Sequence, residues 1–108
     1  MRRPLVEILY FVGCPHYEGA RVLVERVSRE LGVEPELRLV DVPSDEAAER
    51  LRFIGSPTVR VDGEDVDPHA GERDEFARSC RVYRTEAGLA GEPAERWVRD
   101  ALERAVFR

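Results

Sequence analysis

The sequence contains few of the residues that define several large protein classes. Only two cysteines occur, Cys14 and Cys80, which is too few for a secreted disulfide scaffold, and their separation fits no common zinc-binding spacing. No apolar run is long enough to cross a bilayer. The basic start Met1–Arg3 leads into a stretch interrupted by Glu7 and without a small-residue cleavage site, so we expect no secretory signal. These absences predict a cytoplasmic protein with no membrane partner and with reduced thiols.

The charge balance also excludes a class of partner. The chain has no lysine, and its 17 basic residues, all arginine, are outnumbered by 22 acidic ones, for a net charge of −5. An acidic chain is poorly suited to a polyanion, so nucleic acid is not an expected partner. With 43% hydrophobic residues over 108 positions, the composition predicts a single domain, residues 1–108, built around one core.

The segment Val12–Tyr17 joins an expected strand to an expected helix. Residues 5–11 are apolar at almost every position, which predicts a strand covered on both faces. From Tyr17 to Leu31, apolar residues recur every three or four positions, which predicts an amphipathic helix ending at Gly32. Cys14 therefore lies where a strand becomes a helix, with Pro15 expected at the first helical position. Because unpaired N–H groups at a helix start favour an anion, Cys14 is a candidate reactive thiolate.

The rest of the chain alternates strand and helix signals. Together they predict the order β-α-β-α-β-β-α, with a loop-rich insertion at about residues 67–92 before the last helix. The segment 76–83 is ambiguous between a short helix and irregular structure. The remaining expected elements are a strand at 37–42, a helix from the Ser44 N-cap to about Ile54, a strand at 58–61, an Asp62-Gly63 turn, a strand at 65–66, and a helix from Pro93 to the C-terminus.

This order resembles the thioredoxin-like superfamily. The resemblance covers most of the chain and depends on the Cys14 junction and on Ser56-Pro57-Thr58 before the third strand. It implies a three-layer α/β fold in which Pro57 has a cis peptide bond and lies against Cys14. It also implies that Ser56 presents main-chain groups to a bound thiol or peptide, with Ser56, Pro57 and Thr58 forming the substrate-binding loop.

The chain departs from this family at the second cysteine of the motif. The segment Gly13-Cys14-Pro15-His16 is similar to the Cys-Pro-His-Cys site of oxidising members, but Tyr17 occupies the position of the second cysteine. Cys14 thus cannot form the usual disulfide within the motif. Either a monothiol mechanism or a distant partner is required. Cys80 is the candidate partner, since it could resolve a sulfenate or mixed disulfide on Cys14 if the insertion folds back over the strand ends; the alternative is a lone or buried thiol.

Three further residues have a functional and a structural interpretation. His16 could stabilise the thiolate or be a solvated histidine at a helix start. Tyr17 could donate its hydroxyl to the sulfur, although an aromatic in a first helical turn more often packs. Arg81 lies in an arginine-rich segment with Arg78 and Arg84, which could bind a substrate carboxylate or form a solvated face paired with acidic neighbours.

The sequence therefore supports three hypotheses for function. The first is a thiol-disulfide oxidoreductase in which Cys14, His16, Tyr17 and Cys80 are catalytic and Arg81 assists in binding a protein or small-molecule thiol or disulfide. The second is a module that binds a soft metal ion such as mercury through the two thiolates, as the resemblance to small mercury-handling members implies. The third is a thioredoxin-like scaffold without turnover. No cofactor or resident metal is expected.

Overall fold

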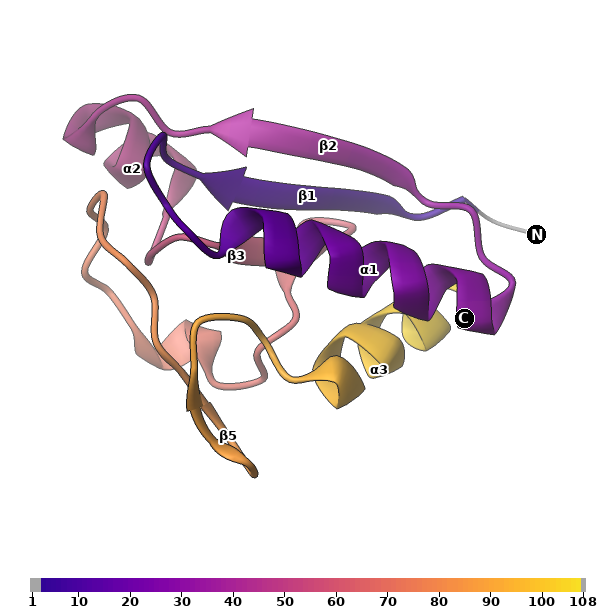
Figure 1. Cartoon of the computed structure of the whole chain (residues 1–108). Coiled ribbons are helices and arrows are strands. Elements are labelled where there is room, and N and C mark those ends of the chain that lie inside the picture. The colour runs from indigo at the N-terminus through magenta and orange to yellow at the C-terminus, as the bar shows by residue number, and fades with distance from the viewer. Residues whose placement is uncertain (1–2, 108) are drawn as a thin grey trace.

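The chain folds as a mixed α/β domain around a four-stranded sheet (Figure 1). The computed structural model describes residues 3–107, so Met1, Arg2 and Arg108, at the basic start and the expected helical end, lie outside the described residues. The elements are β1 (Leu5–Tyr10), α1 (Tyr17–Leu31), β2 (Glu36–Asp41), α2 (Asp45–Leu51), β3 (Thr58–Val61), β4 (Glu64–Asp65), a 3-10 helix (Ala70–Glu72), β5 (Tyr83–Thr85), β6 (Gly88–Ala90) and α3 (Glu95–Val106).

The sheet contains both parallel and antiparallel pairs, in the order β2-β1-β3-β4. Strand β1 is central: it pairs in parallel with β2, Leu5 opposite Glu36, and antiparallel with β3, Leu9 opposite Thr58. Strands β3 and β4 form the expected hairpin, whose turn residues Asp62 and Gly63 both have positive φ. This topology places the end of β1 beside the start of β3. The segment that carries Cys14 leaves the sheet at this point.

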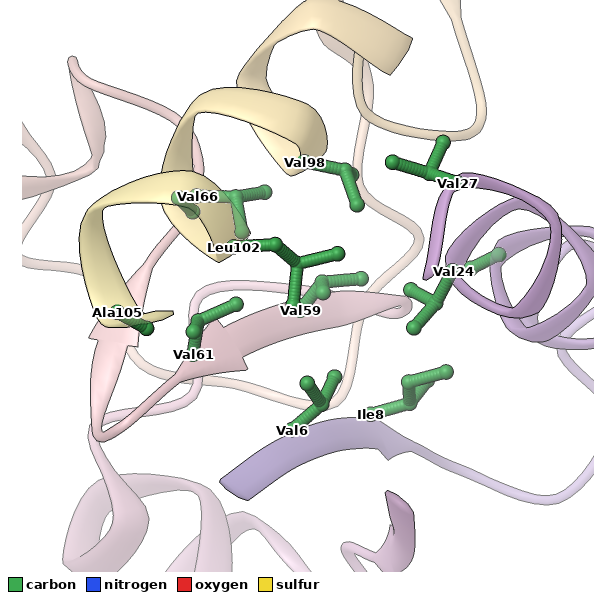
Figure 2. Close-up of a cluster of buried hydrophobic side chains, with 12 residues drawn as sticks. Val6, Ile8, Val24, Val27, Val59, Val61, Val66, Val98, Leu102 and Ala105 are labelled. Carbon is green, nitrogen blue, oxygen red and sulfur yellow. The ribbon is translucent and has the colours of Figure 1, made fainter. Parts of the chain in front are cut away.

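Helices α1 and α3 cover one face of the sheet. Figure 2 shows Val6 and Ile8 of β1 and Val59 of β3 facing Val24 of α1 and Leu102 of α3. These side chains are fully buried, and each buried aliphatic side chain of this size contributes about 1.5–3 kcal/mol relative to exposure. The apolar residues that alternate along the strands therefore pack against those that recur with the helical period, and together they form one core.

Helix α2 covers the other face through a smaller cluster. Leu9 of β1 packs there with Val42, Ala47, Ala48 and Phe53. The N-cap predicted at Ser44 is confirmed, because its hydroxyl accepts a hydrogen bond of 3.1 Å from the Ala47 amide. Helices thus lie on both faces of the sheet, as expected for a central strand that is apolar on both sides.

Several expected boundaries differ from the structure. Helix α2 ends at Leu51 rather than near Ile54, because Arg52 adopts a left-handed conformation. Pro15 and Pro93 both precede their helices: the N-caps are His16 and Ala94. The strands expected at 37–42 and 65–66 each begin one residue earlier, at Glu36 and Glu64.

The expected insertion is more ordered than a loop. It contains the 3-10 helix and a β5–β6 hairpin that projects away from the main sheet (Figure 1). The hairpin turns at residues 86–87; Gly88, which follows the turn and pairs with Thr85, has a φ of 113°, and Leu89 in the middle of β6 is exposed. No helix between residues 3 and 107 is long and apolar enough to span a membrane.

Candidate functional site

Cys14 lies in the turn between β1 and α1. Its amide donates a 3.1 Å hydrogen bond to the Phe11 carbonyl, which closes the turn, and the residue is 4% exposed. Helix α1 begins at Tyr17 with His16 as its N-cap, so Cys14 precedes the cap by two residues. Cys14 thus lies at the strand-to-helix junction, as predicted, but the helix begins two residues later than the predicted first helical residue, Pro15.

The Ser56–Pro57 loop enters β3 beside this turn. The peptide bond between Ser56 and Pro57 is cis, which confirms that part of the prediction. Because Leu9 pairs with Thr58, the chain that leaves β1 toward Cys14 passes the loop that enters β3. Ser56 is 1% exposed, and its buried hydroxyl oxygen has no hydrogen-bond partner among the described residues.

Residues 78–82, which we call the strap, pair with this loop. The Ser56 amide donates to the Ser79 carbonyl at 2.8 Å, and the Ser56 carbonyl accepts from the Arg81 amide at 2.9 Å. This bridge places Cys80 directly beside Ser56 in parallel orientation. The expectation that Ser56 offers free main-chain groups therefore differs from the structure, because the chain itself occupies both groups.

The strap also reaches the Cys14 turn. The Arg78 guanidinium lies 5.5 Å from the centre of the Phe11 ring, and Phe11 is the residue whose carbonyl closes that turn. The Arg78 amide donates at 3.3 Å to Asp45, the first residue of α2. Residues 77–79 form a tight turn, in which the Ser79 amide donates to the Ala77 carbonyl at 3.0 Å, and Cys80 follows this turn to pair with Ser56. The two cysteines, distant in sequence, therefore belong to one cluster of loops, and both are free thiols.

Arg81 fixes the strap from the other side. Its side chain is fully buried and makes a bidentate ion pair with Asp65, at 2.7 and 3.2 Å, and a second ion pair with Asp67 at 3.3 Å. Its guanidinium also donates to the Thr58 hydroxyl at 3.2 Å. The predicted contacts of Arg81 and Thr58 with substrate differ from this arrangement, because both side chains are inside the fold and bonded to each other.

Tyr83 completes the anchor. Its hydroxyl donates a hydrogen bond to the Pro57 carbonyl, and its ring centre lies 4.2 Å below the Arg81 guanidinium. Burial raises the pKa of the Tyr83 hydroxyl, which keeps it a neutral donor. Burial lowers the pKa of Arg81, but Tyr83 and the Asp65 and Asp67 carboxylates outweigh this effect and raise it overall. The strap is thus held to the Ser56–Pro57 loop by main chain and side chain together.

His16 lies at the α1 N-terminus beside Glu92. Its Nδ1 is 3.8 Å from a Glu92 carboxylate oxygen, and both side chains are partly exposed. The Glu92 carboxylate approaches so closely that a Cβ atom at Gly19 would lie 2.3 Å from it, and a Cβ at Gly91 would lie 2.5 Å from the His16 ring. The helix N-terminus therefore already has a negative side chain beside it, which the sequence did not predict.

Tyr17 has a packing role. Its ring stacks on Tyr10 with centres 4.4 Å apart and planes inclined by 20°. This is the structural alternative considered for Tyr17, since the stacking joins the first turn of α1 to the end of β1.

Two cavities lie beside the insertion. One of about 590 Å³ is lined by Asp67, His69, Arg73 and Arg84, and one of about 580 Å³ lies between the β5–β6 hairpin and the start of α3. Neither is lined by Cys14, Ser56 or Cys80. His69, in the insertion, pairs with Glu72 at 2.8 Å. Within residues 3–107, no three histidine, cysteine or carboxylate side chains gather to hold a metal ion.

Sequence reasoning missed the anchor residues Asp65, Asp67 and Tyr83. The local pattern points the other way: alternation along Cys80-Arg81-Val82 would place the cysteine and the valine inside, whereas the structure buries Arg81 and exposes Cys80 and Val82. The pairing of Arg81 with Asp65 and Asp67 had no local signal, because these residues meet only when the insertion folds back on the sheet. Neither a protein-family model nor a curated protein matches the chain.

Proposed function

We propose that the protein is a thiol-disulfide oxidoreductase of thioredoxin-like type in which Cys14 attacks the substrate and Cys80 resolves the product. One observation carries this proposal: the strap that bears Cys80 pairs with Ser56, next to the turn that bears Cys14. The cis Ser56–Pro57 bond and the position of Cys14 at the end of the central strand are further support.

In the proposed reaction, the Cys14 thiolate attacks one sulfur of a disulfide R–S–S–R and releases R–S⁻, leaving a mixed disulfide on Cys14. The Cys80 thiolate then attacks the Cys14 sulfur, releases the second R–S⁻ and forms a Cys14–Cys80 disulfide. Two protein thiols are oxidised, and one substrate disulfide is reduced. Cys14 precedes the α1 N-cap His16 by two residues, and the unpaired N–H groups at a helix start favour a nearby anion.

The two cysteine variants test this proposal. At neutral pH, Cys14 should react with iodoacetamide faster than a cysteine in an unstructured peptide, and Cys14→Ser should abolish reduction of a small disulfide. Cys80→Ser should still attack, but it should stop as the mixed disulfide. A Cys14 thiol no faster than the peptide, with no exchange, would contradict the proposal and favour the scaffold without turnover.

A soft-metal site is a second candidate, because both free thiols belong to one loop cluster. Two thiolates suit the linear coordination of a soft ion such as Hg²⁺. Equimolar binding of Hg²⁺ that is lost in both Cys14→Ser and Cys80→Ser, in a protein that reduces no disulfide, would select this function.

A further inference from the structure

The main-chain edge beside Cys14 is already filled. Extended polypeptides bind folded domains by pairing with free N–H and C=O groups at a strand edge. At Ser56, the residue that could offer such groups beside the Cys14 turn, both groups are bonded to the strap, at 2.8 and 2.9 Å. An incoming polypeptide would have to displace residues 79–81 before it could pair there.

The strap is not easily displaced. The buried Arg81 holds it to Asp65 and Asp67, and Tyr83 holds the next residues to the Pro57 carbonyl. The main chain of the strap also lies very close to that of Gly55, since a Cβ atom at Gly55 would lie 2.8 Å from the Arg81 Cβ and 3.1 Å from its Cα. Opening the strap would separate the buried Arg81 guanidinium from the Asp65 and Asp67 carboxylates, and an uncompensated buried charge is strongly unfavourable.

The access to Cys14 is also narrow, since the residue is 4% exposed while Cys80 is exposed. A disulfide within a folded protein is flanked by polypeptide, and this polypeptide finds no free main-chain groups at Ser56 to pair with. A disulfide between two small organic groups needs only to bring one sulfur to the thiolate.

We infer that the thiol site acts on low-molecular-weight disulfides and excludes protein disulfides, because the strap occupies the place that a protein substrate would take. This inference rests on the proposed function and names its substrate class. The strap then has two roles: it blocks the edge at Ser56, and it supplies Cys80 as the resolving thiol in the reaction written above.

A competition between two disulfides tests the inference. The reduced full-length protein is oxidised with bis(2-hydroxyethyl) disulfide or with insulin, and each rate is divided by the rate of the same disulfide with dithiothreitol. We expect the normalised rate to be at least about tenfold higher for the small disulfide, as for a step whose barrier differs by about 1.4 kcal/mol. Equal normalised rates, or a preference for insulin, would overturn the inference. Failure to react with either disulfide would instead contradict the proposed function.

A matched pair of variants tests the role of the strap. Arg81→Lys loses the bidentate geometry with Asp65 and should raise the relative rate with insulin, whereas Arg84→Lys, at an exposed position on β5, should leave the ratio unchanged. Amide hydrogen exchange in the unaltered protein is independent of whether Arg81→Lys folds. The Ser56 and Arg81 amides should be protected from exchange. Exchange as fast as in an open loop would show that the strap leaves Ser56 readily, so that it does not block the pairing of another polypeptide there.

Discussion

At the scale of single residues, the buried arginine Arg81 has the largest structural role near the candidate site. A fully buried guanidinium is costly unless its charge and its donors are matched, and Asp65, Asp67 and Thr58 provide that match. One donor, Nε, has no partner among the described residues. The site therefore commits its strongest polar interactions to the position of the strap and not to a ligand.

Tyr83 gives a pH dependence whose sign follows from burial. The pKa of Tyr83 is raised in the folded protein, so the unfolded chain releases this proton first as the pH rises. The stability that Tyr83 contributes is present below the ordinary tyrosine pKa of about 10 and is lost above it, by about 1.4 kcal/mol per pH unit.

Tyr83→Phe tests this effect. Urea unfolding at about pH 8 and about pH 11 should show a steeper loss of stability in the unaltered protein than in the variant, because the variant has no proton to release at this position. At pH 8, the variant should be less stable by about 1 kcal/mol, since the Pro57 carbonyl loses its donor. Equal losses between the two pH values in both proteins would contradict the buried neutral hydroxyl.

At the scale of elements, the contact between the strap and the loop before β3 depends on glycine. Gly55 has a φ of 137°, a conformation that other residues rarely adopt, and the Arg81 side chain and backbone fill the space where its Cβ would be. The strap can lie this close to the Ser56–Pro57 loop only because residue 55 has no side chain.

Gly55→Ala should therefore destabilise the protein by more than about 1 kcal/mol and speed amide exchange at Ser56 and Arg81. Gly71→Ala is the matched control: its φ is not positive, and a Cβ there would meet no atom within 4 Å. Urea denaturation and hydrogen exchange measure both effects. A Gly55→Ala protein as stable as Gly71→Ala, with both amides still protected, would show that the close approach is not required.

The elements also show what a sequence can predict. Helix α1 covers the predicted apolar period, Tyr17–Leu31, and ends at the predicted C-cap Gly32, because both are local signals, although Pro15 precedes the helix. The Asp62-Gly63 turn was predicted for the same reason. The β5–β6 hairpin was not, because its short strands pair only with each other and carry no long alternating pattern.

The candidate site was predictable in part. Cys14 and Pro57 stand out locally, one at a strand-to-helix junction and one before a β-branched strand. The position of Cys80 depends on long-range pairing with Ser56 and on the buried contacts of Arg81, and such contacts are not encoded in any single segment. No local feature of the sequence distinguishes the arginines of the 78–84 segment from one another, whereas the fold buries Arg81 and leaves Arg84 exposed.

At the scale of the whole molecule, the sheet brings together two segments that are far apart in the chain. Cys14 follows the central strand β1. The insertion before α3 folds back to the start of β3, where Cys80 pairs with Ser56. The cavities of about 590 and 580 Å³ lie beside the insertion, and neither is lined by Cys14 or Cys80. The proposed chemistry therefore depends on how the insertion folds back, and not on a deep pocket.

The formation of a Cys14–Cys80 disulfide is the most direct test of this account. The reduced protein is treated with one equivalent of bis(2-hydroxyethyl) disulfide, and the products are analysed by intact mass and peptide mapping. We expect a monomer about 2 Da lighter, with Cys14 joined to Cys80, since exchange through a mixed disulfide ends in an internal bridge when the second thiol is within reach. A stable mixed disulfide on Cys14, with Cys80 still reduced, would contradict it.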